Sequence, residues 1–222
     1  MPMRAAIIAL CVAATHLGGR SALADDAARK TTPALRLVWL DPGDVAAGSE
    51  LAARAEATRL LSRMGATVFW RRGAGGEQAE PGEIRVVLLG AGPEPSSGPP
   101  VLGATRTKLG VAPVVWVRVP HVRAAVGIPE CRSLLGLEPA SRNVVATALG
   151  RVIAHEVVHA LVPSLAHGHG LMADRLTRRQ LTAPSILVDS EVAAAVLASF
   201  RGNPVFAPPL TGLLAAEAVG RE

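Results

Sequence analysis

The sequence contains no tyrosine, and aromatic residues make up only 3% of its 222 residues. The formal net charge is +5, but the arginines are scattered along the chain and form no basic cluster. Surfaces that bind nucleic acids combine clustered lysine and arginine with aromatic side chains that stack on bases. We therefore expect no nucleic-acid partner and assign the excess positive charge to a solvated surface.

Long apolar runs are also rare, and the first of them lies at the amino terminus. Arg4 precedes an apolar stretch over residues 5–14, and Ala22-Leu23-Ala24 follows. This pattern is typical of a secretory signal peptide, residues 1–24, that is cleaved after Ala24. About ten apolar residues are too few to span a bilayer, and we expect no later stretch to be long enough to cross one. The sequence therefore predicts a secreted or periplasmic protein without a stable membrane span.

Cysteine occurs at two positions only, Cys11 and Cys131. Cleavage after Ala24 would remove Cys11, and Cys131 would then have no partner for an internal disulfide. A lone cysteine in a loop is more typical of a small, half-buried side chain than of a nucleophile.

The remaining residues, 25–222, suffice for a single domain with a substantial core. Alternating or continuous apolar runs predict strands, and apolar residues that recur at helical spacing predict helices. The expected strands are residues 34–40, 67–70, 84–89, 101–105 and 114–119, and the expected helices are residues 49–64, 143–162 and 190–200. This order predicts an α+β fold: a twisted mixed sheet of four to five strands, a central helix capped by Ser141 and ended by Pro163, and a small C-terminal helical part.

The central helix carries the sequence His155-Glu156-Val157-Val158-His159. Histidines four residues apart lie on one face of a helix, so their imidazoles can reach one metal ion. Two unpartnered histidines in so apolar a helix would cost several kcal/mol, and a shared ion removes that cost. The pattern therefore predicts a Zn²⁺ site.

A catalytic zinc site takes three protein ligands and leaves one position open to water. We expect His167 to be the third ligand, because the chain reversal at Pro163 lets the following loop fold back onto the helix. His169 in the same loop is an alternative, and Asp174 and Glu191 are more distant ones. Glu156 lies about 100° round the helix from His155, so we expect it to act on water as a general base and not to bind the ion.

With these residues the chain resembles the metzincin clan of zinc metallopeptidases. It looks more closely like a group of secreted bacterial peptidases that combine H-E-x-x-H, a histidine eight residues later and a G-[IL]-M turn, here Gly170-Leu171-Met172. The resemblance implies a metzincin-like fold in which Met172 forms the floor beneath the metal. It also implies that the short edge strand, residues 101–105, binds a peptide substrate antiparallel to itself.

The sequence departs from the clan at three points. The clan's third histidine lies six residues after the second, where this chain has Leu165, and its bend glycine is replaced by Val162. The absence of tyrosine removes a side chain that some metzincins use to stabilise the oxyanion. Arg175 and His169 are candidate donors in its place.

The sequence as a whole predicts a secreted zinc metallopeptidase that acts on peptide or protein substrates by metal-activated water. One alternative is a catalytically inactive, zinc-stabilised binding domain, which would have no need of Glu156. A second alternative is a gluzincin-type hydrolase with Glu191 as the third ligand. The oligomeric state is left open.

Overall fold

The computed structural model describes residues 33–90, 100–108, 111–131 and 133–202. The chain divides into two units, Met1–Thr32 and Pro33–Glu222. The predicted signal peptide, residues 1–24, lies outside the described residues, so both its cleavage and the domain start at residue 25 stay predictions.

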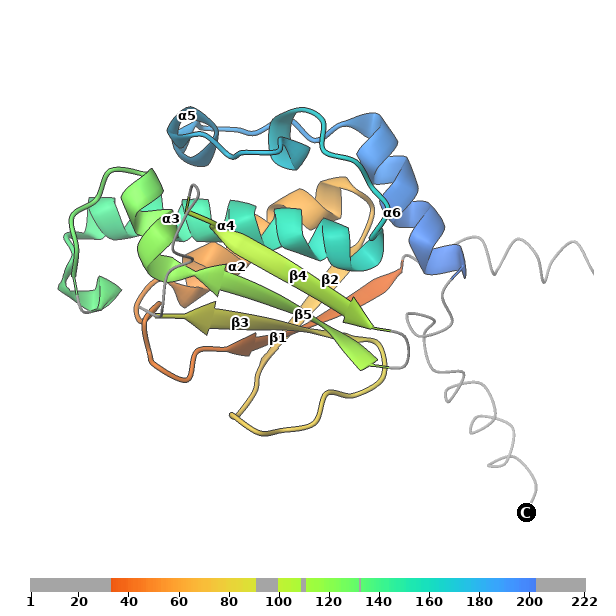
Figure 1. Cartoon of the computed structure of the whole chain (residues 1–222), viewed down its shortest axis with the longest axis horizontal. Helices are drawn as coiled ribbons and strands as arrows, with labels where there is room; N and C mark the ends of the chain where they lie inside the picture. Colours follow the sequence, from red (N-terminus) through yellow and green to blue (C-terminus); the bar gives the residue numbers. More distant parts are fainter. Residues whose placement is uncertain (1–32, 91–99, 109–110, 132, 203–222) are drawn as a thin grey trace, which may run out of the picture. The chain divides into compact units, whose positions relative to one another are not determined.

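Five strands form one mixed sheet in the order β2-β1-β3-β5-β4 (Figure 1). They are β1 (Ala34–Leu40), β2 (Thr67–Arg72), β3 (Glu83–Leu89), β4 (Gly103–Lys108) and β5 (Val111–Arg118). All neighbours are parallel except β4, which runs antiparallel to β5 at the edge of the sheet. The apolar runs of β1 and β3 occupy inner positions, as parallel strands covered by helices do. The predicted α+β class with a mixed sheet is confirmed.

Two long helices, α2 (Glu50–Arg63) and α4 (Pro139–Leu161), lie together against one face of the sheet (Figure 1). Their contact is close at Gly150, where a Cβ atom would lie 2.6 Å from the carbonyl oxygen of Ala53. The core between helices and sheet contains fully buried side chains of β1, α2 and α4, among them Leu35, Leu37, Leu60, Leu61, Leu149 and Ile153. This packing places α4 in contact with β4 and β5.

Shorter elements complete the described part of the chain. They are α3 (Val119–Ala125), α5 (Arg178–Thr182), α6 (Ser190–Gly202) and the 3₁₀ turns η1 (Leu134–Gly136) and η2 (Gly170–Met172). Both α5 and α6 contact α4; in Figure 1, α5 lies on its side away from the sheet, and α6 runs past its right-hand end.

The structure corrects several predicted boundaries. Ser141 is not the N-cap of α4, because the helix already begins at Pro139, whose fixed φ suits a first turn. The edge strand is Gly103–Lys108 and not residues 101–105, since its pairing with β5 starts at Gly103. Strand β5 is Val111–Arg118 and not residues 114–119, and Val119 and Pro120 instead belong to the first turn of α3, a helix that was not predicted.

We expected no stretch after the signal peptide to be long enough for a membrane span. Judged by length and composition only, this expectation is wrong. Among the described residues, α4 is long and apolar enough to cross a bilayer. However, 83% of its most apolar stretch is buried inside the fold. Contacts with the sheet and with α2 therefore account for its apolar composition.

Candidate metal centre

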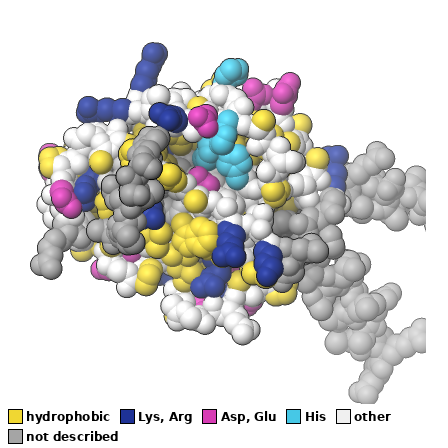
Figure 2. Space-filling model, viewed as in Figure 1, with side chains coloured by type: hydrophobic (Ala, Val, Ile, Leu, Met, Phe, Trp, Pro, Cys, Tyr) yellow, Lys and Arg dark blue, Asp and Glu magenta, His cyan; other side chains and the backbone are white. Residues whose placement is uncertain are grey.

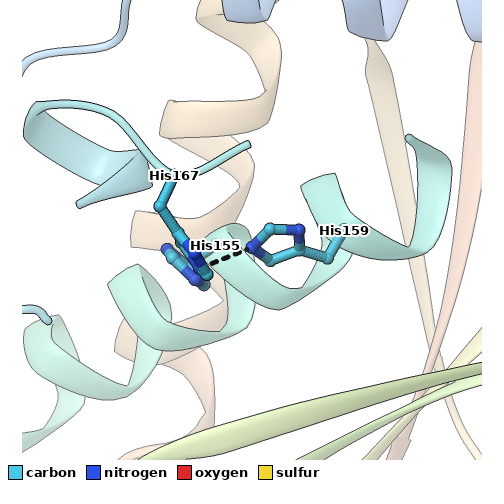
Figure 3. A group of neighbouring side chains, drawn as sticks. All are labelled: His155, His159 and His167. Atoms are coloured by element: carbon cyan, nitrogen blue, oxygen red, sulfur yellow. Dashed lines mark hydrogen bonds between the residues drawn. The ribbon is translucent and has the colours of Figure 1, made fainter. Parts of the chain in front are cut away.

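Three imidazoles converge between α4 and the loop that follows it (Figure 3). The Nε2 atoms of His159 and His167 are 3.1 Å apart. One ring nitrogen from each of His155, His159 and His167 lies within 4.8 Å of the other two. Tetrahedral Zn–N bonds of about 2.0–2.1 Å place two ligand nitrogens about 3.4 Å apart. The three side chains could therefore hold a metal ion after small side-chain adjustments.

The structure places His167 in this group and leaves the alternative ligands outside it. His169 is exposed at the start of η2, and Glu191 is exposed in the first turn of α6. Asp174 Oδ1 is 3.5 Å from Nδ1 of His167, on the outer side of that ring. A carboxylate in this place orients an imidazole so that Nε2 points inward. Asp174 lies outside the group of three imidazoles and could support the His167 ring if that ring bound a metal.

His155 is the most deeply buried of the three, with 8% of its surface exposed. Its Nδ1 donates a hydrogen bond to the backbone carbonyl of Leu171 at 2.7 Å. Because a carbonyl oxygen only accepts, the proton is on Nδ1 and the lone pair of Nε2 is free for a metal. Met172, the next residue, is buried within η2, so the Gly-Leu-Met turn contacts His155 through the Leu171 carbonyl.

The loop between α4 and η2 reverses without a glycine at the bend. The helix ends at Leu161, Val162 leaves the helical conformation with φ −132°, and the amide of Leu165 donates to the Val162 carbonyl. Gly170 is the position in this loop that requires glycine. Its φ is +56°, and a Cβ atom there would lie 2.3 Å from the Leu187 carbonyl oxygen. The loop that carries His167 therefore ends at a position that requires glycine.

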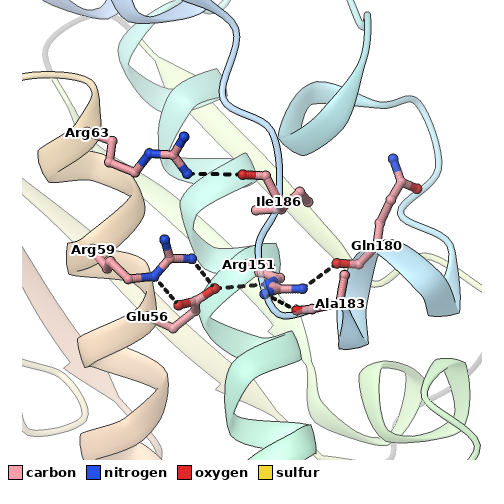
Figure 4. A network of polar contacts seen from close by, with 7 residues as sticks. All are labelled: Glu56, Arg59, Arg63, Arg151, Gln180, Ala183 and Ile186. Atoms are coloured by element: carbon pink, nitrogen blue, oxygen red, sulfur yellow. Dashed lines mark hydrogen bonds and ion pairs between the residues drawn. The ribbon is translucent and has the colours of Figure 1, made fainter.

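A buried arginine on α4 joins α2 to the segment around α5 (Figure 4). Arg151 lies one turn before His155 on α4 and is 1% exposed. Its Nε donates to Glu56 Oε1 on α2 at 2.9 Å, and its Nη1 donates to the Gln180 carbonyl at 2.5 Å. The Gln180 side chain in turn donates to the carbonyl of Gly170 at 3.2 Å. The position of η2 beside His155 is thus linked, through Gln180, to a guanidinium that is buried one turn earlier on α4.

Glu156 faces the same cavity as the histidines. This cavity has a volume of about 710 Å³ and is bounded by β4, α4 and the loop after α4. Figure 2 shows histidine side chains gathered in a hollow on this face of the molecule. Glu156 is 8% exposed, and its Oε2 accepts a hydrogen bond from Thr105 Oγ1 at 2.7 Å. Burial raises the pKa of Glu156, and the Thr105 hydrogen bond partly opposes this. A raised pKa suits a carboxylate that takes up a proton near neutral pH.

Sequence reasoning missed Thr105 because β4 is a short, mostly polar edge strand, and nothing in its pattern points to a residue 51 positions later. Arg175, the candidate oxyanion donor, is exposed and lines the cavity wall, and its role stays a prediction. Cys131 is a free, half-buried thiol outside this cavity, as expected.

The metal-free protein is expected to lose stability as the pH falls from about 6.5 to about 4. Burial lowers the pKa of His155, and burial together with His155 and His167 lowers the pKa of His159 to about 4. Histidines of the unfolded chain titrate at about 6.5, so the unfolded state takes up protons first and is favoured below that pH.

Melting temperatures of EDTA-treated protein across this pH range test this expectation. The variant His155→Gln/His159→Gln is the control, because it keeps every carboxylate but should lose the part of the pH dependence that the histidines cause. Identical pH profiles for parent and variant would contradict the prediction.

No protein-family model matches the chain, and no curated protein matches its sequence.

Proposed function

We propose that this protein is an exported zinc-dependent metallopeptidase that hydrolyses peptide bonds in peptide or protein substrates. The observation that carries the proposal is the placement of the Glu156 carboxyl group on the cavity at which three imidazoles converge. A metal site that served only structure would need neither an open cavity nor a buried carboxylate beside its ligands. Export rests on the predicted signal peptide.

The donor set fits zinc. Three imidazole nitrogens with an open fourth position are typical of catalytic zinc, and the lowered pKa values of His155 and His159 keep these rings neutral and able to bind at neutral pH. Zinc held there would supply a Lewis acid that activates water near neutral pH and polarises a carbonyl group.

Glu156 would perform the proton transfers of the reaction. Its carboxylate accepts a proton from water as the water oxygen forms a bond to the substrate carbonyl carbon. The same carboxyl group then gives that proton to the amide nitrogen as the C–N bond breaks. Burial of Glu156 supports this role, because a carboxyl group with a raised pKa holds the proton long enough to pass it on.

The metzincin-like form of the fold is part of this proposal. It is supported by the antiparallel edge strand β4 beside α4, by the third histidine in the loop, and by Met172 buried in a turn whose Leu171 carbonyl contacts His155. The exposed position of Glu191 on α6 gives no support to a gluzincin-type site.

Metal analysis and hydrolysis of fluorescein-labelled casein test the function, with Glu156→Gln as the decisive variant. We expect about one zinc ion per chain in both proteins. We expect hydrolysis to fall by about 10²- to 10⁴-fold in Glu156→Gln, because the amide cannot accept the proton. Glu130→Gln, at an exposed carboxyl group outside the cavity, is the matched control.

Equal hydrolysis by the parent and Glu156→Gln would overturn the proposed mechanism. Zinc in both proteins without any hydrolysis would instead support the zinc-stabilised binding domain, and absence of zinc from both would overturn the metal site.

A further inference from the structure

The edge strand β4 passes directly over Glu156. Gly103 and Thr105 are two residues apart, so they face the same side of the strand, and here that side is turned toward α4. Thr105 Oγ1 lies 2.7 Å from Glu156 Oε2 and 2.8 Å from the backbone carbonyl oxygen of the same residue. We propose that Thr105 is a positioning residue that holds the Glu156 carboxyl group in its reactive orientation, an inference that rests on the proposed peptidase function.

The orientation of this carboxyl group depends on one contact. Within the described part of the chain, Thr105 is its hydrogen-bond partner, and Glu156 forms no ion pair there. A buried glutamate side chain without this bond would be free to turn about its terminal torsion. Its distance to a reacting water would then vary, and a displacement of about 1 Å at a reacting group is enough to cost about 100-fold in rate.

The hydroxyl group of Thr105 has one proton and two acceptors within reach. When Glu156 is a carboxylate, the hydroxyl donates to Oε2, which is the stronger acceptor because it is charged. When Glu156 has taken a proton from water on its other oxygen, Oε2 is a carbonyl oxygen and still accepts the hydrogen bond from Thr105 Oγ1. Thr105 therefore keeps the carboxyl group in place both before and after the proton transfer.

Gly103 provides the space for this arrangement. A Cβ atom at residue 103 would lie 2.8 Å from Glu156 Cγ and 3.0 Å from both Glu156 Oε1 and Val152 Cγ1. The φ of Gly103 is not positive, so its backbone conformation is open to any residue. Glycine is needed here because a side chain would push the carboxyl group away from its place.

Thr105→Val and Thr105→Ser separate positioning from packing. With a quenched fluorescent peptide as substrate, we expect Thr105→Val to lower kcat by about 10- to 100-fold, the effect of losing a hydrogen bond to a charged group. KM and zinc content should stay within about 2-fold of the parent. Thr105→Ser keeps the hydroxyl group and should restore kcat to within about 3-fold. Thr67→Val, the same change at an exposed position of β2, is the matched control.

Gly103→Ala tests the second part of the inference without removing any hydrogen-bonding group. We expect a lower kcat with zinc content retained, because the added methyl group displaces Glu156 and not the histidines. Gly75→Ala is the control, since a Cβ atom at residue 75 has no neighbour within 4 Å. Melting temperatures of all variants show whether each one is folded.

The outcomes distinguish this inference from the function on which it rests. If the parent hydrolyses peptides and folded Thr105→Val matches its kcat, only the positioning role is overturned. If Thr105→Ser is as slow as Thr105→Val, the hydroxyl group is not what matters, and the role is again overturned. If the parent holds zinc but hydrolyses nothing, the proposed function fails and this inference fails with it.

Discussion

Replacing His167 with alanine is expected to abolish both zinc binding and peptide hydrolysis. The remaining pair, His155 and His159, comes from one helix and offers only two of the three ligands that a catalytic zinc needs. Loss of an outer partner alone weakens metal binding by about 10- to 100-fold, and loss of a direct ligand should cost more. Zinc content after dialysis against a weak chelator, together with casein hydrolysis, measures the effect.

Two variants serve as controls for His167→Ala. His169→Ala removes an exposed histidine from the same loop, and Glu191→Gln removes the carboxylate of a gluzincin-type alternative. Both are expected to keep about one zinc ion per chain. Retention of zinc by His167→Ala with its loss from Glu191→Gln would reverse our assignment of the third ligand.

Arg151→Ala is expected to destabilise the protein by about 3–5 kcal/mol, the usual cost of removing one partner of a buried ion pair. The change leaves the carbonyl groups of Gln180 and Ala183 without their donor, and it creates a cavity at a side chain that is 1% exposed. Because whole domains are stable by about 5–15 kcal/mol, this is a large share of the total. Urea unfolding of metal-free protein measures it.

Arg59→Ala is the matched control, since Arg59 pairs with the same Glu56 but its side chain is 42% exposed. An exposed pair contributes about 0–1 kcal/mol, so the two alanine variants should differ by several-fold in their effect. Equal destabilisation would mean that burial of Arg151 is not what makes its contacts strong. We also expect Arg151→Ala to weaken zinc binding, because η2 would lose its link through Gln180.

The features predicted well from sequence are those encoded within a few residues of chain. Strand β1 agrees with the prediction at both ends because a β-rich run meets Asp41-Pro42 directly after Leu40. The convergence of His155 and His159 follows from helical spacing alone. His167 could be predicted as a third member of the group because Pro163 had to end the helix nearby. In the structure the helix ends at Leu161.

The features that sequence could not provide depend on contacts between distant segments. The sequence assigned Arg151, with the other arginines, to a solvated basic surface. In the structure it is buried, and its partners Glu56 and Gln180 are 95 and 29 residues away in the sequence. The Thr105 contact with Glu156 likewise spans 51 residues. Local patterns carry no information on such pairs, because each partner alone resembles an ordinary surface residue.

The three histidines lie within thirteen residues of chain, from His155 to His167, whereas the strand that holds Glu156 lies some fifty residues upstream. The entropic cost of closing the loop between His159 and His167 is small. The cost of bringing β4, paired with β5, against α4 is larger because these segments are far apart in the sequence. During folding, the three histidines can therefore come together as a local event, while the contact between Thr105 and Glu156 forms only once the sheet edge is complete. For the enzyme that we propose, a chain that has bound its metal would still be inactive, and docking of the edge strand would be the step that completes the site.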